Sequence, residues 1–190
     1  MKRILVIDNY DSFVNNIIHL IRENSDLAVE RVCNDQIDFK RLSEYDALVL
    51  SPGPGLPYSA GSLMKCIDHC SMSHKIVGIC LGHQALFEYF GGRLIQLDRI
   101  RHGHKTSVRL TGVNDALLRF IPSDATAGMY NSWTADPDSV PEELVITSVD
   151  DTGAILSFCH RTLPLHGIQF HPESVMSNCG KEIVMALTEL

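Results

Sequence analysis

Short apolar runs alternate with amphipathic segments through the first half of the chain. Strands are predicted at 4–8, 28–33, 47–50 and 76–79. Helices are predicted between and after them, one with Phe13, Ile17, Leu20 and Ile21 on a single face and others near 38–42, 62–70 and 84–90. Because strands and helices alternate, we predict a parallel sheet with ligand chemistry at the carboxyl ends of its strands.

The pattern changes in the middle of the chain, where strands follow one another with short polar connections. They are predicted at 93–97, 106–110, 144–149, 154–159 and 165–170, before a closing helix marked by Ile183, Val184 and Leu187. This arrangement predicts an α/β fold: a mostly parallel central sheet flanked by helices, with an antiparallel extension. We expect residues 1–190 to form a single domain.

Cys80 lies in the segment 78–84 (GICLGHQ), between a predicted strand and a predicted helix. The glycines two positions before and after the cysteine permit a sharp, crowded turn that lifts the side chain clear of the sheet. The free amides at the start of the following helix favour a thiolate over a thiol. The pattern is typical of a nucleophile elbow, although a free cysteine taken alone is more often a small buried hydrophobe.

A histidine that would suit this thiol lies far along the chain, in the segment 169–174 (QFHPES). A catalytic thiol needs a base, and the base needs a group that orients it. Pro172 biases His171 toward extended backbone, in which residues two apart point the same way. His171 and Glu173 are therefore the candidate base and its orienting partner, in a site assembled from distant parts of the chain.

The loop 51–57 (SPGPGLP) follows a predicted strand and is rich in glycine and proline. Such a loop holds its few backbone amides in fixed directions, which an oxyanion hole requires. The amide of Leu81, directly after the cysteine, is the natural second donor. Taken alone, such a loop is more often an ordinary strand-to-helix turn stiffened by proline. It is not a phosphate loop, because no Gly-Lys-Ser/Thr follows the glycines.

Together these motifs resemble those of the class I glutamine amidotransferases. The matching segments span nearly the whole chain in the expected order: 8–13 (DNYDSF), 51–55, 78–85, 130–132 and 170–174. The Cys/His/Glu set is common to the class, whereas the DNYDSF opening is similar to the branch that serves chorismate-utilising synthases. The resemblance implies a flavodoxin-like fold and hydrolysis of L-glutamine.

By this resemblance Cys80 is the nucleophile, His171 the base and Glu173 its orienting partner. The positions at which the family binds glutamine, several of them through backbone atoms, are Gly53, Pro54, Gly55, Leu81, Gln84, Ser132 and Trp133. No cofactor is implied in this chain. The implied partner is a larger synthase subunit that uses the ammonia to aminate chorismate, in anthranilate or aminodeoxychorismate synthesis.

Two departures from the family pattern keep other interpretations open. Asn131 stands where the family usually has histidine, and His104 is an extra residue in the family's His-Gly-Lys segment, which in relatives lies near the synthase. One alternative is a stand-alone cysteine hydrolase of γ-glutamyl compounds. Another is a regulatory or binding module of the same fold whose thiol does not turn over.

Charge and cysteine usage narrow the partners and the compartment. A net charge of −7 argues against nucleic acid or an anionic membrane as the main partner. The six cysteines show no disulfide-scaffold spacing, and we find no signal-peptide or membrane-length apolar segment. We therefore expect a cytoplasmic protein.

A cluster of cysteine and histidine at 66–74 is the one competing metal motif. On a helix Cys66, Cys70 and His74 would share a face, but the outer two would lie about 12 Å apart along the axis. That separation is too large for one zinc ion. We predict a core-facing pair of cysteines and no metal site.

Overall fold

Eight strands form the central sheet of the computed structural model, which describes residues 2–190. Across the sheet they are β2 (Ala28–Cys33), β1 (Arg3–Asp8), β3 (Ala47–Leu50), β4 (Lys75–Ile79), β12 (Leu165–Ile168), β11 (Ile155–His160), β10 (Leu144–Val149) and β7 (Arg109–Leu110). The first five are parallel, and the last three continue the sheet antiparallel. The predicted α/β fold with an antiparallel extension is confirmed.

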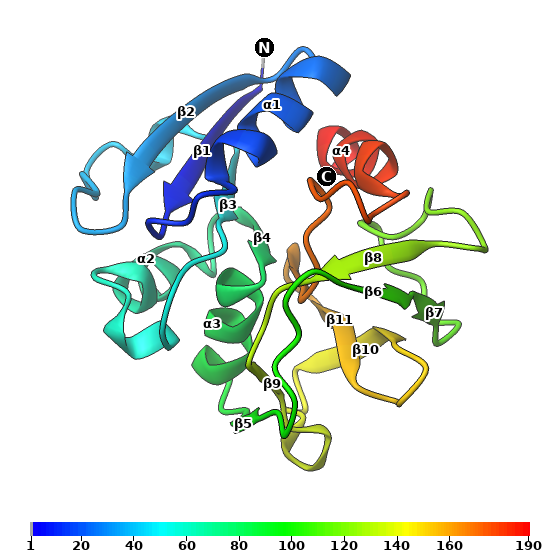
Figure 1. Cartoon of the computed structure of the whole chain (residues 1–190). Helices are drawn as coiled ribbons and strands as arrows, with labels where there is room; N and C mark the ends of the chain where they lie inside the picture. The colour runs from blue at the N-terminus through cyan, green and yellow to red at the C-terminus, as the bar shows by residue number, and fades with distance from the viewer. Residues whose placement is uncertain (1) are drawn as a thin grey trace.

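Helices cover both faces of this sheet (Figure 1). On one face α1 (Val14–Asn24) and α4 (Gly180–Glu189) pack together, and on the other α2 (Leu63–Cys70) packs against α3 (Leu81–Tyr89). The parallel strands are buried on both sides, which explains why β3 is apolar at every position. Among residues 2–190, no helix combines the length and hydrophobicity needed to cross a membrane.

The chain between β4 and β10 adds two small two-stranded sheets beside the central one. In one, β5 (Leu94–Gln96) pairs with β9 (Trp133–Ala135); in the other, β6 (His104–Ser107) pairs with β8 (Thr126–Met129). An isolated bridge joins Gly128 of β8 to His171, whose amide donates to the Gly128 carbonyl at 3.0 Å. The added strands therefore hold the chain that follows β12.

The prediction of a helix at 38–42 was wrong. That segment is a turn, followed by a single 3-10 turn at Leu42–Glu44. The Asp38 carboxylate accepts a hydrogen bond from the Lys40 amide at 3.0 Å. Such local side-chain bonds compete with the first turn of a helix.

Cys66 and Cys70 of α2 are both fully buried in the core, as predicted for a core-facing pair. His74 lies beyond the end of the helix. Its Nε2 atom is 3.0 Å from the carbonyl oxygen of Leu42.

Candidate active site

Cys80 and His171 leave the sheet from neighbouring parallel strands. In β4 and β12, Ile79 stands opposite Ile168, and the Cys80 amide donates to the Ile168 carbonyl at 2.9 Å. Parallel strands end at the same edge of a sheet. The pairing of these two strands therefore brings residues 169–171 beside Cys80, although they are far apart in the sequence.

The backbone at Cys80 has the strained, crowded geometry of an elbow. Its φ of +52° lies in the left-handed region, which residues with a side chain seldom adopt. A Cβ atom on Gly78 would lie 2.4 Å from the carbonyl carbon of Gly82, and one on Gly82 would lie 2.3 Å from the Leu50 oxygen. Only glycine fits at both positions. The sharp turn predicted from the glycine spacing is confirmed.

His171 and Glu173 form a buried pair. The Nδ1 atom of His171 is 2.7 Å from Oε1 of Glu173, and their side chains are 2% and 0% exposed. The carboxylate holds the proton on Nδ1. Nε2 makes no regular hydrogen bond among residues 2–190, so it is available to exchange a proton with the thiol.

The charges around His171 favour its protonated form. Burial by itself would lower the pKa of His171. The Cys80 sulfur and the Glu173 carboxylate both favour the imidazolium ion, and together they outweigh burial and raise this pKa to about 10. At neutral pH the site therefore holds an imidazolium ion beside the Cys80 sulfur.

Aromatic rings surround the imidazole on its other sides. The ring centroids of Phe13 and Tyr130 lie 5.6 and 4.9 Å from that of His171, both edge to face. His102 packs on Tyr130 in the same manner, at 5.6 Å. These rings exclude water from His171. They also connect it to the loop that carries His102.

The glycine-proline loop after β3 lies against the start of α3. A Cβ atom on Gly53 would lie 2.5 Å from Cβ of Asn9 and 2.6 Å from Cδ2 of Leu81. Asn9 fixes the base of the loop, because its backbone amide donates to Ser51 Oγ at 2.9 Å and its side-chain amide donates to Ser51 O at 2.8 Å. The loop is therefore rigid and close to the residue that follows Cys80.

A pocket of about 170 Å³ opens beside Cys80. It is lined by Gly53, Pro54, Gly55, Cys80, Gln84, Tyr130, Asn131, Ser132 and Trp133. The structure thus brings together six of the seven predicted glutamine-binding residues. The seventh, Leu81, has a side chain buried in the core, which leaves only its backbone for a ligand. The pocket is well below the roughly 300–1,000 Å³ of sites for drug-sized ligands. It suits a single amino acid.

Two buried glutamine side chains, Gln84 and Gln169, form a chain of hydrogen bonds from this pocket to the thiol. Gln84 Nε2 donates to the Trp133 carbonyl at 2.8 Å and to Gln169 Oε1 at 3.0 Å. Gln169 Nε2 donates to the Cys80 sulfur at 3.5 Å. The segment 169–174 was singled out in the sequence, but nothing in its local pattern marks Gln169 as a neighbour of the thiol.

Asn131 and His104, the two departures from the family pattern, both make specific contacts in the structure. Asn131 donates from Nδ2 to the Trp133 carbonyl at 2.9 Å, while its Oδ1 atom is buried and has no partner among residues 2–190. His104 is the first residue of β6 and pairs with Met129. The extra residue is therefore paired within the small β6–β8 sheet.

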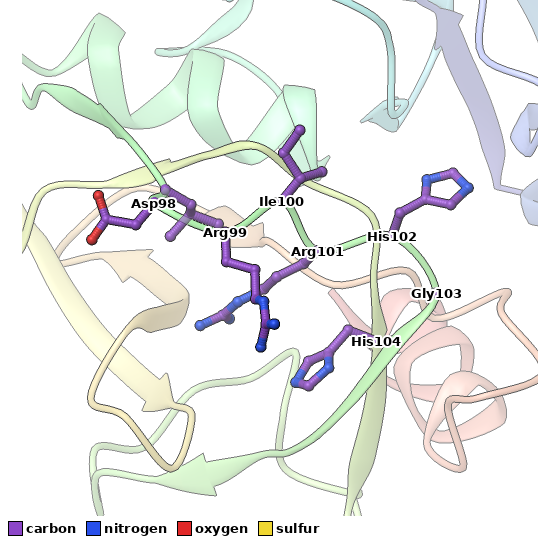
Figure 2. Close-up of a pocket in the computed structure, with 8 residues that line it drawn as sticks. Asp98, Arg99, Ile100, Arg101, His102, Gly103 and His104 are labelled. Carbon is purple, nitrogen blue, oxygen red and sulfur yellow. The ribbon is translucent and has the colours of Figure 1, made fainter.

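The loop 97–104 encloses a second hollow, of about 560 Å³ (Figure 2). Arg101 is anchored there by an ion pair with the buried Asp150, with 2.7 Å between Nη1 and Oδ2. In Figure 2 the side chains of Arg99, Arg101 and His104 extend to the same side of the loop. Through His102 and Tyr130, this basic loop is continuous with the rings around His171.

Comparison with known proteins identifies the class to which this fold and site belong. Residues 5–188 match the family "Glutamine amidotransferase class-I". The chain therefore belongs to the class I glutamine amidotransferases, as its motifs indicated.

Its relatives include subunits of two kinds of synthase. The chain is 35% identical to the aminodeoxychorismate/anthranilate synthase component 2 of Bacillus subtilis, over 98% of this chain and 95% of that protein. It is 36% identical to the aminodeoxychorismate synthase component 2 of Escherichia coli, over 95% and 96% of the two chains. Anthranilate synthase component 2 of Mycobacterium tuberculosis is 37% identical, over 96% of this chain and 79% of that protein.

Solved structures agree with the fold. A Thermoplasma acidophilum protein assigned as a GMP synthase subunit superposes with a TM-score of 0.87 at 27% identity, covering 100% of this chain and 93% of that one. A glutamine amidotransferase of Thermotoga maritima superposes with a TM-score of 0.75 at 18% identity, covering 100% and 84%.

Proposed function

We propose that this chain is the glutaminase subunit of a chorismate-aminating synthase. It hydrolyses L-glutamine to glutamate and delivers the ammonia to a larger subunit that makes anthranilate or 4-amino-4-deoxychorismate. The observation that carries the proposal is the meeting of Cys80, the His171–Glu173 pair and an amino-acid-sized pocket at one edge of the sheet. Relatives named for both synthases support the choice of acceptor.

In the first half of the reaction the Cys80 thiolate attacks the side-chain carbonyl carbon of glutamine. A C–S bond forms, and the carbonyl oxygen takes the negative charge next to the Leu81 amide and the amides of the 53–55 loop. His171, as imidazolium, protonates the amide nitrogen. The C–N bond then breaks, and ammonia leaves behind a glutamyl thioester.

In the second half neutral His171 accepts a proton from water, and the resulting hydroxide attacks the thioester carbonyl. The C–S bond breaks, glutamate departs, and the thiolate–imidazolium pair is restored. Glu173 keeps its hydrogen bond to Nδ1 in both halves and stabilises the imidazolium. Gln84, Ser132, Trp133 and the 53–55 loop hold the substrate in the pocket during both halves.

Exposed apolar side chains around the site supply a surface for the larger subunit. They lie next to the site segments: Tyr10, Leu56, Tyr58, Ile100 and Val175. Val175, only two positions after Glu173, is 100% exposed. Exposed apolar side chains next to a functional site are typical of a binding face. A partner bound there would cover the mouth of the site and receive ammonia before it reaches bulk water.

We propose that the partner also sets the activity. The loop 97–104 reaches His171 through His102 and Tyr130, and the 53–55 loop carries the oxyanion donors. A partner that contacts either loop adjusts the catalytic groups. A misplaced oxyanion donor typically costs about 10²–10³ in rate, so the free chain is a poor glutaminase.

Steady-state glutaminase kinetics test this function. The purified chain is assayed alone and with anthranilate or aminodeoxychorismate synthase subunits plus chorismate. We expect low activity alone, a rise of about 10²–10³-fold with a cognate subunit, and an aminated product. Full activity alone, unchanged by any such subunit, would favour the stand-alone hydrolase. No activity under either condition, with bound partner, would favour the regulatory module.

A further inference from the structure

Gln169 is the first residue after β12, and its side chain is wholly buried between the thiol and the pocket wall. We propose that Gln169 is a catalytic residue, whose side-chain N–H donates a hydrogen bond to the Cys80 sulfur and stabilises the thiolate. The reaction it serves is the glutaminase reaction proposed above. The contact itself needs neither glutamine nor a partner subunit, and it can be tested without them.

A backbone carbonyl fixes the direction of this hydrogen bond. The Trp133 carbonyl can only accept, so the Gln84 group 2.8 Å from it must be the NH₂ group. That NH₂ group also lies 3.0 Å from Gln169, which must therefore present its oxygen to Gln84. The Gln169 NH₂ group is then left on the side of the sulfur. Each amide orientation follows from the one before it.

A donor aimed at sulfur has a defined chemical effect. A thiolate accepts an N–H bond strongly, whereas a thiol is only a weak acceptor, so the contact favours ionisation of Cys80. It acts at a second point in the cycle as well. When water has attacked the thioester, the departing sulfur regains its negative charge, and the same N–H group stabilises it as a leaving group.

The chain of amides also connects the substrate pocket to the nucleophile. Gln84 donates one N–H group to Trp133 and the other to Gln169. Its Oε1 atom is therefore left to accept a hydrogen bond from a ligand in the pocket. Trp133 and Gln84 are both pocket residues. Gln84 can thus bind a ligand in the pocket through its oxygen atom while its NH₂ group orients Gln169.

The titratable groups around the sulfur include His171, Glu173 behind it, and Tyr130, which lines the same pocket and packs on His171. Gln169 is neutral, so its variants do not remove a charge from the wild-type site. A variant that lacks the N–H donor therefore tests the hydrogen bond separately from the thiolate–imidazolium pair.

The test is the pH dependence of alkylation of Cys80 by iodoacetamide, followed by mass spectrometry of the peptide that contains it. Gln169→Leu removes the donor. Gln169→Glu keeps the shape and the acceptor for Gln84 but presents a carboxylate oxygen to the sulfur. Gln84→Met leaves Gln169 in place but removes the group that orients it. Gln36→Leu, at an exposed glutamine beyond β2, is the matched control. Circular dichroism and thermal unfolding check that each variant is folded.

We expect Gln169→Leu to move the midpoint of alkylation about one pH unit upward, and to slow alkylation about tenfold at pH values below the wild-type midpoint. Gln169→Glu should lose at least as much, although it is nearly isosteric, and Gln84→Met should give a smaller change in the same direction. Wild-type alkylation profiles for folded Gln169→Leu and Gln169→Glu would overturn the proposal. If neither variant folds, an unchanged profile for Gln84→Met would overturn it. A shifted profile in a chain that shows no glutaminase activity even with a bound synthase subunit would instead refute the proposed function and leave the contact standing.

Discussion

His171 and Glu173 stand two positions apart and are joined by 2.7 Å between Nδ1 and Oε1. A turn makes this contact possible, since the Ser174 amide donates back to the His171 carbonyl at 3.2 Å. The carboxylate therefore reaches the imidazole over the intervening Pro172. The base and its orienting group come from a single short segment, and one strand pairing delivers both to Cys80.

Replacement of His171 should harm turnover more than replacement of Glu173. His171→Asn removes the proton carrier, for which we expect a loss of about 10²–10⁴-fold in kcat of the activated complex. Glu173→Gln keeps the imidazole and should lose less, because an orienting group is less indispensable than the base. Steady-state kinetics of both variants in the complex measure the difference. A silent Glu173→Gln together with a dead variant at another carboxylate would show that the orienting residue is misassigned.

The same Glu173→Gln variant should narrow the pH range of activity. Glu173 raises the pKa of His171, so its removal lowers that pKa. The imidazolium that protonates the leaving ammonia is then lost at a lower pH. We expect the alkaline limb of the kcat/KM profile to move to lower pH, and an alkaline limb that stays in place would contradict this role.

Gly82→Ala should destabilise the fold, because the new Cβ would lie 2.3 Å from the Leu50 oxygen, a backbone atom of β3. Overpacking of this kind typically costs about 1–3 kcal/mol. The matched control is Gly112→Ala, where φ is +87° but no atom lies within 4 Å. There only the left-handed backbone is penalised, by about 1–2 kcal/mol. Urea unfolding compares the two, and loss of Cys80 alkylation in Gly82→Ala alone would locate the damage at the elbow. A Gly82→Ala chain with wild-type stability and alkylation would refute the crowding argument.

His83 makes the fold sensitive to acid. It is fully buried on α3, neither ring nitrogen has a partner among residues 2–190, and burial lowers its pKa to about 3. Since an unfolded histidine titrates near pH 6.5, its contribution to stability is complete above that pH and is lost as the pH falls toward 3. At pH 5 the loss amounts to about 2 kcal/mol.

His83→Leu should therefore unfold with a weaker dependence on pH between 7.5 and 5 than the parent chain. Its control is His19→Leu, because the His19 side chain is 73% exposed. Urea unfolding at several pH values gives the slopes. If the unfolding free energy of the parent and of His83→Leu depended equally on pH, the folded chain would accommodate protonated His83, and this account of acid sensitivity would be wrong.

Val175→Asp should weaken binding of the synthase subunit while leaving the isolated thiol reactive. Val175 lies at the proposed binding face, and a charge there opposes burial against a partner. Met72→Asp is the control, since Met72 is 79% exposed after the end of α2. Titration of the partner by calorimetry should show at least about tenfold weaker binding for Val175→Asp alone. Equal affinities would place the interface elsewhere.

The parallel strands of the sheet were predictable because burial on both faces makes them continuous apolar runs. The bounds of β3, Ala47–Leu50, follow directly from such a run. β8 and β9 were missed, since each has only three or four residues and is stabilised by partners far away in the sequence. The extended interpretation of 169–174 was also incomplete, because the Ser174 amide donates back to the His171 carbonyl in a turn. The Ser174 hydroxyl in turn lies 3.0 Å from that of Tyr130, which is far away in the sequence.

The members of the site were predictable, but some of their contacts were not. Cys80 and its glycines carry a local signal, because the elbow itself requires those residue types. The contact between Gln169 and the sulfur exists only because β12 inserts beside β4 in parallel. No local pattern specifies that order of strands. The ring of Tyr130 on His171 depends in the same way on the bridge at Gly128.

The most direct test of the account is the nitrogen source of a reconstituted complex that carries Cys80→Ser. Product formation from chorismate is measured with glutamine and, separately, with ammonium salt. We predict that the variant complex loses glutamine-dependent synthesis and retains ammonia-dependent synthesis at the wild-type rate, and that an alkylating glutamine analogue labels Cys80 in the wild-type chain. Retained glutamine-dependent synthesis, or labelling at Cys66 or Cys159 in place of Cys80, would contradict the account.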